Sequence, residues 1–389
     1  MQRFVLFGGA VFTPFEVIEG GAVSVADGRI DQVGPRAAVV AEGAVELDVG
    51  GRIICPGFVD LQVNGGGGAF LSDDPGGGAL ERMARAHVQF GTTSMLATAV
   101  TGAEASMRAA LVAVKEHMLQ PPPGARVIGA HLEGPFINPR RRGAHREQFI
   151  QPPSKELFDR LLDAAGGSLR LITLAPELPG ALELVERARA ASVVVAAGHS
   201  DATYDETQRA LAGGVSAGTH VFNAMRPLEQ REPGVIGALL QDGSAVVTLI
   251  ADGVHVHPAC LELVYRCKGA ERTALITDAM PPVGTAASQF RLLGADVTVR
   301  GGACYLDNGT LAGSALSMNA AVRNMSDLAG VPLLECVRMA TATPARVLGL
   351  QSEIGVLGPG ARADIAVCNA DMSVWKVFVG GELAYAADA

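Results

Sequence analysis

Histidines and carboxylates gather at the ends of apolar stretches in this sequence, where they could act together. They are Asp60, His131, Glu133, His145, His199, His220, Asp252, His255, His257 and Asp278. Imidazole and carboxylate groups bind divalent cations such as zinc, and they also transfer protons in general acid–base catalysis. The repetition of this pattern along the chain predicts one shared metal or acid–base site.

Glu133, His199 and His220 are the predicted metal ligands, in the segments HLEGP, AGHSDATYDE and GTHVFNAM. One carboxylate and two imidazoles leave a coordination position for water, which is the arrangement of catalytic rather than structural zinc sites. The alternative is three unrelated structural roles: an ion pair of Glu133 with a loop arginine, a helix start at His199 and a buried His220.

Asp278 ends the apolar stretch LITDAM and is the predicted acid–base residue. A carboxylate beside a metal-activated water can accept its proton and pass it to a leaving amine. The alternative is a structural anchor or loop cap. His255, in IADGVHVHP, could donate a hydrogen bond to a polarised carbonyl oxygen. Asp252 is either a substrate contact or a turn residue, and His257 is expected to be structural.

The middle of the chain supplies elements that could bring these residues together. Apolar β-type stretches alternate there with amphipathic helical stretches such as GALERMARAHVQF. The eight stretches are 57–63, 92–100, 126–132, 169–175, 192–198, 214–222, 245–251 and 272–278. Eight such units predict an α/β fold, a (β/α)8 barrel of the TIM type, whose catalytic residues lie at the carboxyl ends of the strands. A doubly wound open sheet is the alternative, although no GxGxxG follows the first strand.

Both ends of the chain differ from the middle. Residues 1–55 and 355–389 consist of short β-type runs separated by glycine and proline turns. We therefore expect one small β domain built from both termini, with a barrel domain over residues 56–354 inserted between them. The glycine run GGGGAF at 65–70 is expected to be a flexible active-site loop.

Composition and charge restrict the partners. Of the 389 residues, 49% are hydrophobic and 18% charged, so the chain can bury a large core. The formal net charge of −9 argues against a nucleic-acid or anionic-membrane surface but leaves an anionic small molecule open. The six scattered cysteines, without a CxxC pair, favour thiols of a reducing compartment. We see no signal peptide and no apolar run long enough to span a membrane, and expect a cytoplasmic enzyme.

Seven segments, in this order, are similar to the amidohydrolase superfamily and within it to the N-acetylglucosamine-6-phosphate deacetylases. They are PGFVDLQVNGGGG, HLEGPFINPRRRGAH, GHSDATYDE, THVFNAMRPLEQREPG, IADGVHVHP, TDAM and LAGSALSM. The resemblance covers essentially the whole chain. It implies a barrel flanked by a β-sandwich formed from both termini. It also implies hydrolysis of N-acetyl-D-glucosamine 6-phosphate to D-glucosamine 6-phosphate and acetate.

The resemblance also implies roles for individual residues. The family's metal ligands correspond to Glu133, His199 and His220. Asp278 corresponds to its catalytic acid and base, and His255 to its carbonyl-polarising histidine. The matching substrate contacts are Ala144, His145, Asn223, Ala224, Arg231 and the backbone of Leu311, Ala312 and Gly313. Arg231 resembles an arginine that binds phosphate in the neighbouring subunit, which implies a homodimer; a surface ion pair with Glu229 or Glu232 is the alternative.

The first predicted strand departs from many amidohydrolases. Where those have HxH, which supplies two ligands for a second metal, this chain has Gln62-Val63-Asn64, as some deacetylases do. Neutral amides are poor transition-metal ligands, so we expect one divalent metal ion per subunit. Zinc fits the three ligands, and iron, manganese or cobalt could occupy the same site. Gln62 is expected to orient the water and to lie with the substrate-binding residues.

Other functions stay open at this point. A deacetylase of N-acetylgalactosamine 6-phosphate or an N-acyl-amino-acid deacylase would use the same site, and only the second would lack a phosphate requirement. A non-catalytic sugar-phosphate sensor or a scaffold would not need an intact set of metal ligands beside Asp278. The adjacent Arg140, Arg141 and Arg142 are expected to form a solvated loop, with phosphate binding as the alternative.

Overall fold

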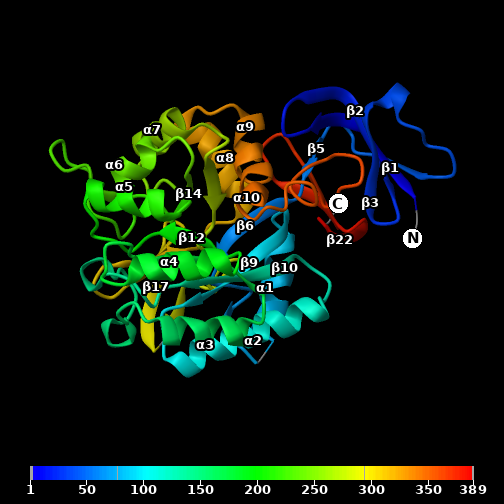
Figure 1. Ribbon diagram of the computed structural model, residues 1–389. Helices are drawn as coiled ribbons and strands as arrows, with labels where there is room; N and C mark the ends of the chain where they lie inside the picture. Colours follow the sequence, from blue (N-terminus) through cyan, green and yellow to red (C-terminus); the bar gives the residue numbers. More distant parts are fainter. Residues whose placement is uncertain (1–2, 77, 293, 388–389) are drawn as a thin grey trace.

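The computed structural model describes residues 3–76, 78–292 and 294–387, which form a barrel and a separate sheet beside it (Figure 1). The middle of the chain forms the barrel with its surrounding helices. Strands from the two ends of the chain, blue and red in Figure 1, form the separate sheet at the right of that view.

Eight parallel strands form the barrel in sequence order. They are β6 (Phe58–Val63), β9 (Thr92–Val100), β10 (Arg126–Glu133), β11 (Leu169–Leu174), β12 (Val194–Ala197), β13 (Ala217–Gly218), β14 (Val246–Ile250) and β15 (Thr273–Ile276). Neighbouring strands pair from β6 to β15, and an isolated parallel bridge between Val63 and Ala279 joins the two ends of the sheet. Every predicted stretch overlaps one of these strands, so the barrel is confirmed and the doubly wound sheet is excluded.

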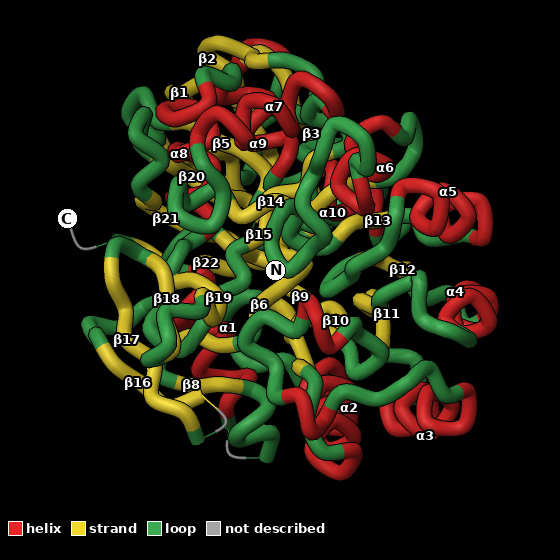
Figure 2. Tube along the Cα trace, turned by 90° about the vertical axis from the view of Figure 1, so that its left-hand side faces the viewer, coloured by secondary structure: helices red, strands yellow, loops and turns green. Residues whose placement is uncertain are grey.

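Helices surround the strands on the outside of the barrel (Figure 2). They are α1 (Ala79–Val88), α2 (Glu104–Leu119), α3 (Lys155–Ala165), α4 (Ala181–Ala190), α5 (Tyr204–Gly213), α6 (Gly234–Gln241), α7 (Pro258–Lys268), α8 (Met318–Ala329), α9 (Leu333–Met339) and α10 (Ala342–Val347). Local signals mark their ends: Ser154 caps α3, and Thr203 with Glu206 forms a capping box at α5. Among the described residues, no helix is long and apolar enough to cross a membrane.

Strands from both termini form the second sheet. They are β1 (Phe4–Phe12), β2 (Val17–Ala26), β3 (Arg29–Pro35), β4 (Val45–Asp48), β5 (Ile53–Pro56), β20 (Ile365–Cys368), β21 (Val374–Val379) and β22 (Glu382–Ala386). The antiparallel pairing of β5 with β20 joins the N-terminal strands to the C-terminal ones. Buried residues from both groups, including Leu6, Ile54 and Val367, share a core of their own. The expected β unit built from both ends is therefore confirmed.

All six cysteines are free thiols.

A small antiparallel sheet lies between β15 and α8 in the sequence, and we call it the cover sheet. Its strands are β16 (Gln289–Leu292), β17 (Ala295–Arg300), β18 (Ala303–Leu306) and β19 (Leu311–Ser314). Leu292, Val297 and Cys304 of this sheet pack against Phe70 and Met280 in an apolar cluster separate from the barrel core. The cover sheet was not predicted from the sequence.

The glycine run after β6 is an ordered hairpin rather than the expected flexible loop. β7 (Gly65–Gly66) and β8 (Ala69–Phe70) pair antiparallel, and all four of these residues are buried. His87 of α1 holds the hairpin in place, because its Nε2–H donates to the carbonyl of Gly65 at 2.9 Å. The ring is fully buried, and this burial lowers the pKa of His87 to about 4.

We expect acid to destabilise the protein partly through His87. Its pKa of about 4 in the folded protein lies below the ordinary value of 6.5, so the unfolded chain binds the proton more readily. The stability gained from the neutral ring is complete above about pH 6.5 and is lost as the pH falls toward about 4. At pH 5 the loss for this one residue is about 2 kcal/mol.

Urea unfolding of the wild type and His87→Gln at pH 7 and pH 5 measures this effect. The glutamine amide can donate to the same carbonyl but does not titrate. The variant should therefore lose about 2 kcal/mol less than the wild type on acidification. Equal losses in the two proteins would contradict the assignment.

Candidate active site

A cavity of about 240 Å³ opens where the carboxyl ends of the barrel strands meet the cover sheet. Its lining contains most of the predicted site residues, namely Glu133, Ala144, His145, His199, His220, Asn223, Ala224, His255, Asp278, Leu311, Ala312 and Gly313. Strand ends far apart in the sequence thus converge as the barrel geometry requires.

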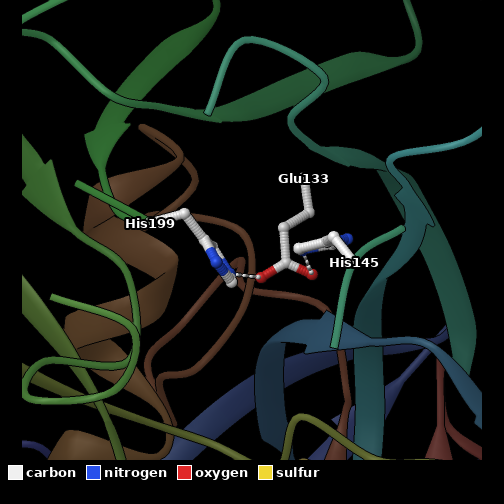
Figure 3. Close-up of side chains that lie close together, drawn as sticks. All are labelled: Glu133, His145 and His199. Atoms are coloured by element: carbon white, nitrogen blue, oxygen red, sulfur yellow. Dashed lines mark hydrogen bonds and ion pairs between the residues drawn. The ribbon is translucent and has the colours of Figure 1, made fainter. Parts of the chain in front are cut away.

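The Glu133 carboxylate is the centre of this cluster. Glu133 ends β10, and its Oε1 lies 3.2 Å from Nε2 of His199, which follows β12, and 3.0 Å from Nε2 of His220, which follows β13. Figure 3 shows the rings of His199 and His145 on opposite sides of this carboxylate; His145 Nε2 is 3.8 Å from Oε2. The three predicted ligands therefore point at one place, with His145 beside them.

These donors fit a divalent cation of the zinc type. Glu133, His145 and His199 each offer a ligand atom within 4.8 Å of the others. His199 Nδ1 donates to the backbone carbonyl of Arg141 at 2.9 Å, which leaves the Nε2 lone pair directed at the site. Burial alone would raise the pKa of Glu133, but the close contacts of its carboxylate with the imidazoles of His199 and His220 outweigh burial and hold the pKa well below its usual range. The carboxylate is thus ionised and ready to bind a cation.

Backbone conformation turns three of these side chains into the cavity. His199, His220 and Asp278 have positive φ angles of 49°, 33° and 49°, a left-handed region that residues other than glycine rarely adopt. Each lies two positions beyond the last residue of a barrel strand, namely β12, β13 and β15. Such strained positions concentrate at functional sites, because packing elsewhere must maintain them.

Two amide side chains hold Asp278. Gln62 Nε2 donates to Asp278 Oδ1 at 3.0 Å and to Glu133 Oε1 at 2.9 Å, and Asn64 Nδ2 donates to the same Asp278 oxygen at 2.7 Å. Burial, and then the negative charge of Glu133, raises the pKa of Asp278 to about 6. A carboxyl group that titrates close to neutral pH is suited to both accepting and releasing a proton.

Asp252 orients His255. Its Oδ1 accepts the backbone N–H groups of Val254 and His255, both at 2.8 Å, and its Oδ2 accepts from His255 Nδ1 at 2.6 Å. Burial would raise the pKa of Asp252, yet its hydrogen bond with His255 lowers it overall. His255 lines the cavity, and its buried Nε2 has no partner among the described residues. Asp252 is thus a turn residue that directs this nitrogen into the cavity.

Three predicted site residues are not among the described residues that line the cavity: Gln62, Asp252 and Arg231. Gln62 and Asp252 lie behind Asp278 and His255 and contact them directly. Arg231 is exposed and forms no ion pair with a described residue. Glu232, the suggested alternative partner, instead accepts the backbone N–H groups of Tyr204 and Gly234.

The three adjacent arginines are held by acidic neighbours. Arg141 Nε donates to Asp201 at 2.7 Å, Arg140 lies 3.6 Å from the other oxygen of Asp201, and Arg142 lies 3.8 Å from Glu147. Their loop therefore presents the Arg141 carbonyl to His199 rather than free guanidinium groups to the cavity.

An apolar wall, which was not predicted from the sequence, completes the cavity. Phe70, Val100, Met280 and Leu292 line one side. Leu292 comes from the cover sheet, whose segment QFRLLGADVTVR alternates apolar and polar residues, a strand signal that was present in the sequence. Asn64 also lines the cavity, although the sequence singled it out only as a poor metal ligand.

Comparison with known proteins places this site in a family. The model of the amidohydrolase family matches residues 53–384. An N-acetylgalactosamine-6-phosphate deacetylase of Escherichia coli O157:H7 is 38% identical over 92% of this chain and 93% of its own length. An N-acetylglucosamine-6-phosphate deacetylase of Bacillus subtilis is 35% identical over 97% of this chain and 96% of its own length.

Solved structures agree with these matches. A mutant N-acetyl-D-glucosamine-6-phosphate deacetylase from Mycobacterium smegmatis, in complex with N-acetyl-D-glucosamine-6-phosphate, superposes with a TM-score of 0.92, 35% identity and coverage of 99% of this chain and 100% of that one. The N-acetylglucosamine-6-phosphate deacetylase of Pasteurella multocida gives a TM-score of 0.94 at 33% identity, with the same coverage of both chains. By sequence, by fold and by the residues at the barrel mouth, this chain belongs to the amidohydrolase family.

Proposed function

We propose that this protein is a metal-dependent deacetylase that hydrolyses N-acetyl-D-glucosamine 6-phosphate to D-glucosamine 6-phosphate and acetate. The observation that carries the proposal is the convergence of Glu133, His199 and His220 on one side of a cavity with the Asp278 carboxylate beside them. The relatives that match nearly the whole chain are named as deacetylases of phosphorylated N-acetylhexosamines, which supports the choice of substrate.

Glu133, His199 and His220 would hold one divalent ion, and zinc suits these donors. When bound, the ion supplies Lewis acidity and lowers the pKa of water from about 15.7 toward about 7. His145 lies close enough to the same carboxylate to help position the ligands or the substrate.

Two side chains carry out the proton transfer and the stabilisation of the acetyl oxygen. Asp278 accepts a proton from the attacking water and delivers it to the departing nitrogen, so one carboxyl group acts first as base and then as acid. His255, held by Asp252 through Nδ1, presents Nε2 to the cavity and donates from it to the acetyl oxygen as negative charge develops there.

Acetate release from N-acetylglucosamine 6-phosphate, before and after chelation and zinc add-back, tests this proposal. N-acetylgalactosamine 6-phosphate is the second candidate substrate, because the Escherichia coli relative at 38% identity is named for it, and it should be assayed in parallel. Unphosphorylated N-acetylglucosamine and N-acyl amino acids complete the set. Metal-restored release from a phosphorylated sugar alone is the expected result, and release from N-acyl amino acids alone would refute the proposal.

We further propose that Arg231 binds the substrate phosphate in the neighbouring subunit of a homodimer. Its exposed guanidinium, with no ion-pair partner among the described residues, lies outside the cavity of its own chain, and guanidinium groups bind phosphate in a bidentate way. Arg231→Ala should raise KM for the phosphorylated sugar by roughly 10- to 100-fold, with a much smaller effect on kcat.

Mixing two impaired variants, assayed at a substrate concentration well below the raised KM of Arg231→Ala, separates this idea from a role within one chain. Arg231→Ala and Asp278→Asn subunits, unfolded and refolded together, should regain activity, since each mixed dimer then contains one complete site. No regain, with mixed dimers demonstrated by differently tagged subunits, would show that Arg231 does not act across an interface.

A further inference from the structure

Asn64 lines the cavity, and the nitrogen of its side-chain amide already donates a hydrogen bond within the protein. The residue follows β6 directly, is 3% exposed, and donates from Nδ2 to Asp278 Oδ1 at 2.7 Å. This contact fixes the assignment of the amide nitrogen and oxygen of Asn64. An amide oxygen in the position of Nδ2 would face a carboxylate oxygen, and neither atom could donate a hydrogen bond.

The other end of the amide, Asn64 Oδ1, is buried and has no hydrogen-bond partner among the described residues. A buried acceptor without a partner is costly, and such atoms in native proteins call for an explanation. Asn64 belongs to the cavity lining together with Asp278 and His255, so a donor entering the cavity could reach this oxygen.

The proposed substrate carries one suitable donor next to the bond that breaks. In hydrolysis of its acetamide the C–N bond is cleaved, the carbonyl carbon gains the oxygen of water to form acetic acid, and the nitrogen gains one proton to form the amine. That nitrogen already carries one N–H. The orientation of this N–H decides whether the lone pair of the nitrogen faces the proton held by Asp278. An acceptor that fixes the direction of the N–H therefore favours the proton transfer.

We propose that Asn64 Oδ1 accepts the N–H of the scissile acetamide and so turns the leaving nitrogen toward Asp278. The proposal rests on the deacetylase function proposed above. One side chain then binds both partners of the proton transfer, the carboxylate through Nδ2 and the substrate nitrogen through Oδ1. Asn64 thereby selects amides with an N–H over esters of the same shape.

An ester analogue isolates this contact. In 2-O-acetyl-D-glucose 6-phosphate an oxygen replaces the N–H, and the acetyl and phosphate groups remain. The kcat/KM values for amide and ester should be compared in the wild type, in Asn64→Leu, which keeps the branched four-atom side-chain skeleton, and in Gln62→Leu. Gln62 is the matched control, because it also donates to Asp278 Oδ1, at 3.0 Å, but has no unpartnered buried atom of the kind found on Asn64.

We expect Asn64→Leu to lower kcat/KM for the amide about 10- to 100-fold more than for the ester, because the buried N–H loses its acceptor. Gln62→Leu should lower both values by similar factors. The same amide-to-ester ratio in the two variants would overturn the proposal, since Asn64 would then act only through Asp278. Should thermal melting show that Asn64→Leu does not fold, Asn64→Ser serves the same comparison.

Failure of this inference is distinct from failure of the proposed function. A wild type that releases no acetate from the amide refutes the deacetylase itself. A wild type that hydrolyses the amide, combined with an unchanged ratio in the Asn64 variants, refutes only the contact with the N–H.

Discussion

Asp278→Asn is expected to lower kcat by roughly 10²- to 10⁴-fold, while metal content and substrate affinity change little. Asparagine has nearly the size of aspartate, and its side-chain oxygen can still accept hydrogen bonds from Gln62 and Asn64. In the wild type these two side chains donate to the carboxylate at 3.0 and 2.7 Å. It cannot, however, accept a proton from water near neutral pH and return it to nitrogen. The loss should therefore fall on the chemical step.

Steady-state kinetics and metal analysis of the purified variant measure this prediction. Asp371→Asn makes the same chemical change at an exposed site near the C-terminal strands and should behave as the wild type. A value of kcat within a few-fold of the wild type, in a variant that retains its metal, would rule out Asp278 as the proton shuttle.

Glu133→Gln is expected to abolish activity through loss of the metal, with affinity for zinc reduced by more than about 100-fold. Glu133 Oε1 is the atom on which His199 and His220 converge, at 3.2 and 3.0 Å. A neutral amide is a poor ligand for such ions.

Metal stoichiometry after gel filtration, and competition with a chelating dye, give the affinity directly. Glu147→Gln, a change at an exposed carboxylate in the loop after β10, is the matched control and should keep its metal. Full occupancy in Glu133→Gln would exclude the proposed ligand set, and His145 would then need to be tested as a ligand in its place.

The barrel and the mouth of its site were predictable from the sequence for one physical reason. Strands of a parallel barrel are buried on both faces, so they appear as continuous apolar runs, as in β9, where all nine residues are buried. A histidine or carboxylate at the end of such a run therefore marks the carboxyl edge of the barrel, as Glu133, His199 and Asp278 do.

The contacts that tune the site were not predictable, because they join residues far apart in the chain. Gln62 and Asp278 are 216 positions apart, and nothing local to either one reveals their hydrogen bond. His87 lies within α1, and nothing in its sequence neighbourhood shows that it anchors the hairpin that follows Asn64. The apolar wall of the cavity likewise depends on where the cover sheet lies over the barrel.

The pairing of β5 with β20 has a consequence for how the protein is made. Ile54 of β5 leaves the ribosome long before Ile365 of β20. The N-terminal strands can therefore pair with β20 only after most of the chain has been synthesised. During that interval the edge of β5 and apolar residues such as Leu6 and Ile54 lack part of their final cover. Nascent chains stalled before residue 365 should therefore bind chaperones through this N-terminal segment, and release from the ribosome should end that exposure.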